Sequence, residues 1–121
     1  MRIFTKNRFY IRLYVNLIDI NDLTNKQSIS EKSETKFNNQ RLLIADFNKA
    51  EHFISNVFKK HGFSSKNSIG IIQQMEMAEG GLSDVEKRVL LELFSKIGIR
   101  EIYVDESLSD LTEKQLLNYK K

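Results

Sequence analysis

The spacing of the apolar residues changes along this chain, from a period of two in the first third to a helical period further on. Residues 8–15 alternate between apolar side chains and side chains of Arg or Tyr, which is typical of a strand with two different faces. One face carries Phe9, Ile11, Leu13 and Val15. The other face carries Arg8, Tyr10, Arg12 and Tyr14. A second strand over 17–23 follows a tight turn near Asn16, so we expect a hairpin, and a weaker third strand covers 27–32.

Two segments with helical spacing follow, and each has a start and a stop signal. The first covers about 48–61, with Asp46 or Asn48 as the N-cap and Gly62 as the stop. The second covers about 84–97, from a Ser83–Glu86 capping box to Gly98. The first apolar side is expected to contain Ala50, Phe53, Ile54, Val57 and Phe58. The second is expected to contain Val85, Val89, Leu90, Leu93, Phe94 and Ile97.

Each of these helices leads into an apolar strand, expected over 68–77 and over 99–104. Residues 32–40 are polar and predict a surface loop, and 42–45 predict a short extended segment. A capping box that begins at Thr112 predicts a last helix over 113–120. The order of elements predicts an α/β fold: a mixed five-stranded sheet with three antiparallel strands, then alternating helices and strands. This is the layout of a ribonuclease-H-like or actin-like half, here as a single domain over 1–121.

Composition excludes several classes of protein and of site. The 121 residues contain no Cys, which excludes disulfides, thiolate metal sites and cysteine nucleophiles. The longest apolar run, 42–45, is far shorter than the roughly 20 residues of a membrane span. Charged residues interrupt the first eight positions, unlike a signal peptide, so we expect a cytoplasmic protein without a membrane partner.

The charge is divided unevenly between the two halves of the chain. Residues 1–66 contain 12 basic and 6 acidic side chains, and 67–121 contain 7 basic and 10 acidic ones. The net charge is +3. A dedicated nucleic-acid-binding protein is expected to have a larger positive charge, concentrated in a dense basic stripe.

No arrangement of residues predicts catalysis or metal binding. A ribonuclease-H-type nuclease needs carboxylates that converge on two metals, and Glu51 and Glu76 fall near two such positions, but the first strand offers no acid. His52 and His61 lie about 13.5 Å apart along one helix at 1.5 Å per residue, too far to share a metal. Gly80-Gly81 before a helix start could hold an anion, but the capping box already satisfies those N–H groups. We therefore predict no catalytic, cofactor-binding or metal-binding residues.

The Arg/Tyr face of the first strand is the most suggestive surface feature. It could stack on nucleobases, it could be covered by a helix, or it could recognise a protein, since Tyr and Arg are favoured at interfaces. The modest net charge favours a covered or protein-binding face. The predicted partner-contact residues are Arg12, Tyr14, Glu76 and Glu79.

Several segments resemble two known families. Residues 44–47, followed by Ala50-Glu51, resemble the entry to the first helix of MreB, the bacterial actin, and 83–88 with 98–104 resemble a second MreB segment. Residues 39–45 and 76–83 resemble the YjaA family of small enterobacterial stress-response proteins. This resemblance extends over roughly 8–104.

The resemblance implies an actin-like half. Actins hold ATP between two such halves, and an Asp with several Gly or Thr residues joins their first two strands around the phosphate. Residues 13–17 here have no Asp, Gly, Ser or Thr, so we expect ATP binding to be lost. We expect a non-catalytic stress-response module that acts on an unidentified protein partner without a cofactor. The alternatives are a degenerate ribonuclease-H-like module that binds nucleic acid, and a small inhibitor or immunity-type protein.

Overall fold

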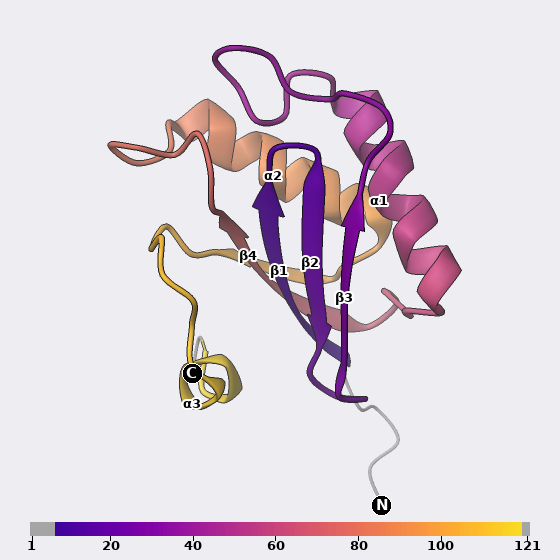
Figure 1. Cartoon of the computed structure of the whole chain (residues 1–121). Helices are drawn as coiled ribbons and strands as arrows, with labels where there is room; N and C mark the ends of the chain where they lie inside the picture. The colour runs from indigo at the N-terminus through magenta and orange to yellow at the C-terminus, as the bar shows by residue number, and fades with distance from the viewer. Residues whose placement is uncertain (1–6, 120–121) are drawn as a thin grey trace, which may run out of the picture.

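Five strands form one mixed sheet in the order β3-β2-β1-β4-β5 (Figure 1). The computed structural model describes residues 7–119. The strands are β1 (Asn7–Tyr14), β2 (Leu17–Asp22), β3 (Gln27–Lys32), β4 (Ser68–Gln74) and β5 (Glu101–Val104). The first three strands are antiparallel, while β4 runs parallel to β1 and β5 runs parallel to β4. This confirms the predicted fold class.

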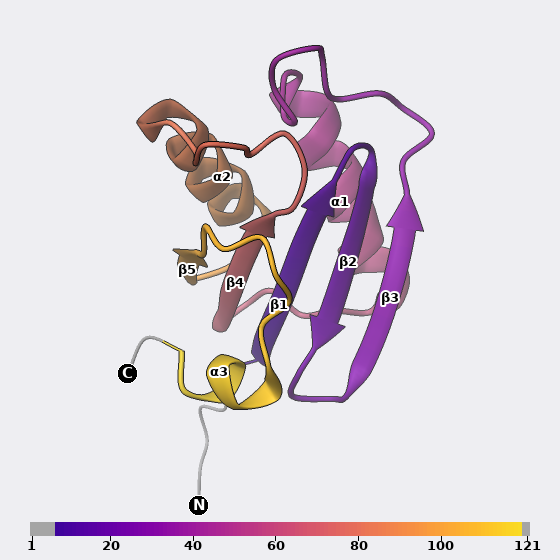
Figure 2. The ribbon, with the colours of Figure 1, turned by 60° about the vertical axis from the view of Figure 1, so that its left-hand side comes forward.

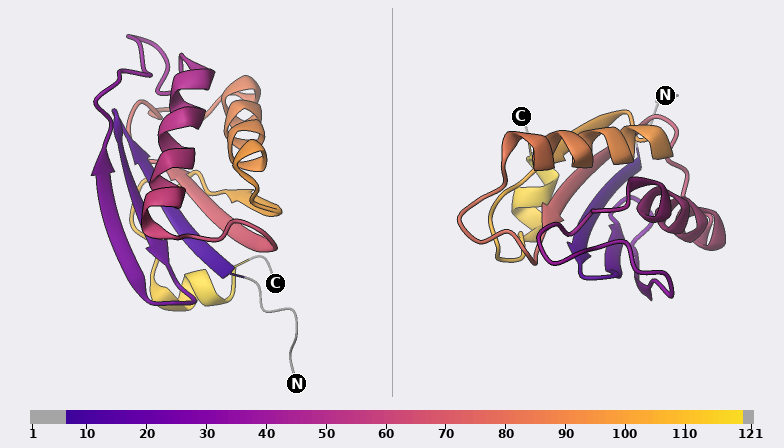
Figure 3. Two further views of the ribbon diagram at one scale, coloured as in Figure 1. Left: turned by 90° about the vertical axis from the view of Figure 1, so that its right-hand side faces the viewer. Right: turned by 90° about the horizontal axis from the view of Figure 1, so that it is seen from above.

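The helices lie on both faces of this sheet. The helices α1 (Phe47–His61) and α2 (Asp84–Ile97) pack side by side on one face. The short helix α3 (Glu113–Leu117) lies on the opposite face (Figures 2 and 3). The sheet therefore has one face under two long helices and one face that is only partly covered.

The main core lies between the sheet and the two long helices, and the alternation of β1 creates its centre. Phe9, Ile11 and Leu13 are fully buried there. The ring of Phe9 packs 5.3 Å from that of Phe58 in α1 and 5.5 Å from that of Phe63. Because side chains alternate along a strand, the same residues of β1 that fill this core force Tyr10 and Arg12 onto the other face.

The predicted caps form. Asp46, and not Asn48, is the N-cap of α1, and its side chain accepts from the N–H of Lys49. Ser83 with Glu86, and Thr112 with Gln115, make complete capping boxes at α2 and α3.

Gly98 ends α2 with φ 117, and a Cβ there would lie 2.6 Å from Ser65 Oγ. Both the backbone conformation and the close neighbour therefore require glycine at this position.

Two residues predicted to be apolar contacts of the core are instead exposed. Val15 is 38% exposed because it lies in the two-residue turn after β1. Val85 is 71% exposed in the first turn of α2. The prediction extended each periodic pattern to the end of its element, where the chain already turns away from the core.

Other predicted boundaries are also wrong. β4 ends at Gln74 and not at Met77, which has φ 59 and cannot continue a strand. Residues 42–45 form no strand; the N–H groups of Ala45 and Asp46 instead donate to the Phe37 carbonyl. Phe37, in the predicted surface loop, is 1% exposed and anchors that loop in the core.

Two further boundaries differ at the C-terminal end of the chain. β5 begins at 101 rather than 99, although Ile99 is buried, and α3 ends at Leu117. The predicted helix end at 120 and the charged N-terminal positions 1–6 lie outside the described residues.

Truncation of Leu93, which is fully buried in α2, should destabilise the fold because it leaves a cavity in the main core. We expect Leu93→Ala to lower the free energy of unfolding by about 2–5 kcal/mol in urea denaturation followed by circular dichroism. Leu91→Ala is the matched control in the same helix, since Leu91 is 41% exposed, and it should change that energy by less than about 0.5 kcal/mol. Equal effects of the two variants would contradict the packing of α2.

Candidate functional site

The segment that follows β5, residues 105–119, crosses the sheet face opposite α1 and α2 (Figure 2). We call it the C-terminal segment. Its contact with the sheet centres on Tyr10, which is 2% exposed. The Tyr10 hydroxyl donates to Gln73 Oε1 of β4 and accepts from the N–H of Leu111 at 3.0 Å. The Arg/Tyr face of β1 is therefore covered at Tyr10, where burial raises the pKa of the phenol.

Gln73 holds the first part of the C-terminal segment. This side chain is fully buried next to Tyr10. Its amide nitrogen lies 2.9 Å from Ser107 Oγ, 3.1 Å from the Ser109 carbonyl oxygen and 3.3 Å from Asp105 Oδ1. Because a buried amide without partners is costly, these contacts fix the path of the chain after β5.

The second part of the segment is held by the two arginines of β1. Arg8 Nη1 donates to the Leu116 carbonyl at 3.1 Å. Arg12 Nη1 lies 3.0 Å from Asp110 Oδ1, and Arg12 Nη2 lies 3.6 Å from Asp19 Oδ2. The Arg12 guanidinium also sits 5.0 Å from the centre of the Tyr10 ring. Both arginines are thus occupied by the chain itself.

A small apolar cluster and one half-buried carboxylate, that of Asp105, complete the contact. Leu116 packs with Tyr10 and Ile71 in a second core, separate from the main one. The Tyr119 hydroxyl donates to Asp105 Oδ2 at the other end of the segment. Burial alone raises the pKa of Asp105, but hydrogen bonds from Tyr119 and Ser107 outweigh it and hold that pKa below its usual range.

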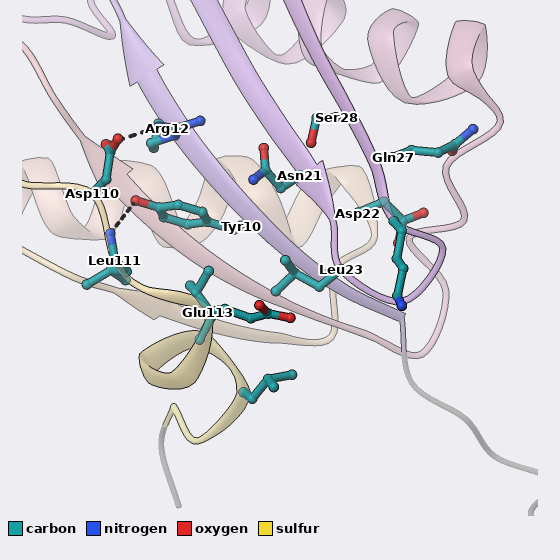
Figure 4. Close-up of a pocket in the computed structure, with 13 residues that line it drawn as sticks. Tyr10, Arg12, Asn21, Asp22, Leu23, Gln27, Ser28, Asp110, Leu111 and Glu113 are labelled. Carbon is teal, nitrogen blue, oxygen red and sulfur yellow. Dashed lines mark hydrogen bonds and ion pairs between the residues drawn. The ribbon is translucent and has the colours of Figure 1, made fainter.

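A groove of about 520 Å³ remains between the C-terminal segment and the uncovered part of the sheet. Figure 4 shows Leu111 and Glu113 on one side of it and Gln27 and Ser28 on the other. Arg12 is 17% exposed and Asp110 is 65% exposed, so their ion pair borders the groove with its carboxylate toward solvent. The lining further includes Asn21, Asp22, Leu23, Lys26, Leu116 and Leu117. The groove therefore offers charged, hydrogen-bonding and apolar groups together.

The turn between β1 and β2 is bonded to other parts of the chain. Glu76 Oε1 accepts from the N–H of Val15 at 2.6 Å. Asn16, at φ 54, accepts from the Phe37 N–H through its side-chain oxygen at 3.1 Å. The Glu76 carboxylate thus accepts from the Val15 N–H, which would otherwise be free to bind an anion.

Of the four predicted contact residues only Arg12 lines the groove, and Tyr14 interacts electrostatically with both Arg12 and Glu76. Tyr14 lies at the end of β1, half-buried, and Glu76 bonds to the turn that follows. Glu79 is exposed on the loop between β4 and α2. Sequence reasoning missed Asp110 and Leu111, which belong to no periodic pattern, and Gln73, a polar residue within the predicted strand over 68–77.

Glu51 and His61, which the sequence offered as possible metal ligands, are both bonded to other side chains of the protein. Glu51 accepts a hydrogen bond from Ser55 in α1 at 3.0 Å. His61 Nε2 lies 2.7 Å from Glu31 Oε2, and this contact, with that of Lys60, lowers the pKa of Glu31. Between residues 7 and 119, no group of three or more His, Asp or Glu side chains is arranged to hold a metal ion.

The fold is that of an actin-like half. MreB5 of Spiroplasma citri bound to AMPPNP superposes with a TM-score of 0.62, and MreB5 bound to ADP with 0.58, both at 12% sequence identity. The similarity covers 84% of this chain but only 39% and 38% of the two MreB5 chains. The chain thus spans less than two-fifths of the length of MreB5.

The chain belongs to the YjaA family. It is 37% identical over 92 residues to the uncharacterized protein YjaA of Escherichia coli K12, across 69% of this chain and 71% of YjaA. No protein-family profile matches it. Within residues 7–119, no helix has the length and apolar content needed to cross a bilayer.

Removal of the Tyr10 hydroxyl should weaken the attachment of the C-terminal segment, because Gln73 Oε1 and the Leu111 N–H then lose a buried partner. We expect Tyr10→Phe to lower the free energy of unfolding by about 1–3 kcal/mol. Tyr14→Phe is the matched control on the same face of β1 and should stay within about 0.5 kcal/mol of wild type. Urea denaturation measures both, and a neutral Tyr10→Phe would disprove the buried network.

Proposed function

We propose that this chain is a non-catalytic binding protein that acts through protein–protein contacts at the groove beside Arg12. The observation that carries the proposal is the composition of this groove. Ionic groups such as Asp110 lie beside exposed apolar ones such as Leu117, which is 55% exposed. Protein interfaces combine apolar and charged groups in this way, with arginine enriched.

The same proposal includes the loss of nucleotide binding. In support, the Glu76 carboxylate bonds to the Val15 N–H in the β1–β2 turn, where it would repel a phosphate. Residues 13–17 also contain no Gly, Ser or Thr, the residue types whose backbone or short hydroxyl side chains hold a phosphate in such turns.

The cellular setting belongs to the proposal as well. We propose a cytoplasmic role in the response to stress, which rests on the resemblance of residues 39–45 and 76–83 to the YjaA family. The absence of Cys agrees with a reducing compartment but does not require one. Tyr14, Glu76 and Glu79 stay proposed as further contacts, at the end of β1 and after β4.

The Arg/Tyr face of β1 is covered at Tyr10 and bonded within the chain, which favours a protein partner over nucleic acid. Tyr10 is buried, and the guanidinium groups of Arg8 and Arg12 bond to the C-terminal segment. Stacking of bases on Tyr10 would require this segment to detach.

Substitution of the exposed Leu117 at the groove should prevent partner binding without unfolding the chain. In chemical cross-linking of tagged protein in cells, we expect Leu117→Asp to reduce recovery of specific partners about tenfold, as for a contact worth ~1.4 kcal/mol. Leu91→Asp is the control, because Leu91 is similarly exposed on α2, away from the groove. Unchanged recovery with Leu117→Asp would refute the groove as the contact surface.

Nucleotide titration tests the second part of the proposal. Calorimetry with ATP and Mg²⁺ should give no saturable heat at millimolar nucleotide. Saturable binding that Tyr14→Ala or Asn16→Ala weakens would show that the β1–β2 turn still holds phosphate and would overturn the proposal.

A further inference from the structure

The outer strand β3 has one side that pairs with β2 and one side that faces no other strand in the described sheet. In an antiparallel ladder, alternate residues direct both N–H and C=O to the same neighbour. The Ser33 N–H donates to the Asn16 carbonyl, which sets this alternation for the β2–β3 pair. Gln27, Ile29 and Glu31 therefore bond to β2, while Ser28, Ser30 and Lys32 direct their backbone groups to the free edge.

This edge lacks a proline and a β-bulge, two of the features by which proteins block strand addition. β3 pairs in regular register with β2 over all six residues, from Gln27 to Lys32, and contains no Pro. Two of the three residues whose backbone groups point to the free edge are serines, Ser28 and Ser30, whose small side chains leave room above the sheet. Gln27 and Ser28 also line the outer side of the groove (Figure 4). The groove thus opens onto the free edge.

The charges along this edge are positive. Lys26 precedes β3 and Lys32 is its last residue; both are exposed, and neither has an ion-pair partner within residues 7–119. The carboxylate of the strand, Glu31, is bound by Lys60 at 2.9 Å and by His61 at 2.7 Å on the helix side. A second copy of this chain would bring the same lysines to the junction, so these charges oppose self-pairing and attract an acidic segment.

We propose that β3 binds an extended acidic segment of a partner protein as a sixth strand. The backbone of that segment pairs with Ser28 and Ser30, and one of its apolar side chains passes over Ser28 into the groove. At about 3.3 Å per residue, the distance between the two lysines corresponds to acidic residues roughly six positions apart in the partner. The proposal rests on the proposed function, since it names the kind of partner that the groove receives.

A displayed library of short extended segments, with alternating random positions, tests the proposal on the full chain. Selection should enrich segments with acidic residues near both ends, and in NMR spectra these should shift and protect the Ser28, Ser30 and Lys32 amides. Lys26→Glu with Lys32→Glu should reverse the charge preference. Absence of enrichment, or shifts confined to other residues, would overturn the inference.

Ser30→Pro provides a separate test, because the Ser30 N–H is not part of the β2 ladder. The substitution should abolish binding of the selected segments. The unfolding midpoint of the variant shows whether the chain still folds. If that midpoint falls, N-methylation of the backbone amides of the segment is the complementary change, because it removes the same strand pairing from the other side. If Leu117→Asp abolishes partner capture while Ser30→Pro and N-methylation have no effect, the proposed function holds and the added strand is wrong. A dimer of wild type that Ser30→Pro dissociates would instead identify a second copy as the occupant and overturn the inference.

Discussion

The hydrogen bonds among Tyr10, Gln73 and Leu111 determine the arrangement of the sheet face that carries the candidate site. Two polar side chains are buried at the centre of adjacent strands, where they would be strongly destabilising without partners. The chain after β5 supplies those partners through Leu111, Ser107 and Ser109. A segment with little regular structure thereby acquires a fixed position, and the groove is the space that it leaves uncovered.

This arrangement follows from the two faces of β1. Its apolar residues fill the main core, and the strand alternation places Arg8, Tyr10 and Arg12 on the opposite face. There each of these three side chains bonds to the C-terminal segment or to a neighbouring strand. The Arg and Tyr side chains of this face, which by themselves would suit the binding of nucleobases, therefore mainly hold the fold together. Only the edge of the face, at Arg12 and Asp110, remains open to a partner.

The elements with a local physical cause could be predicted from the sequence. The alternation in 8–15 and the caps at Ser83 and Thr112 each depend on residues within one element, and the order of elements was sufficient for the fold class. The burial of Phe37 and the exposure of Val85 could not be predicted, since both depend on how separate segments meet. The candidate site was predicted only at Arg12, because Gln73, Asp110 and Leu111 become neighbours through contacts between residues far apart in sequence.

The attachment of the C-terminal segment through Tyr10 is the claim on which the groove, the partner class and the added strand all depend. Amide hydrogen exchange of Leu111, read residue by residue by NMR, tests it most directly, because this N–H donates to the Tyr10 hydroxyl. The account predicts exchange at least about tenfold slower than in an unstructured chain, for an opening free energy above ~1.4 kcal/mol. Exchange of the Leu111 amide at the rate of an unstructured chain would contradict it.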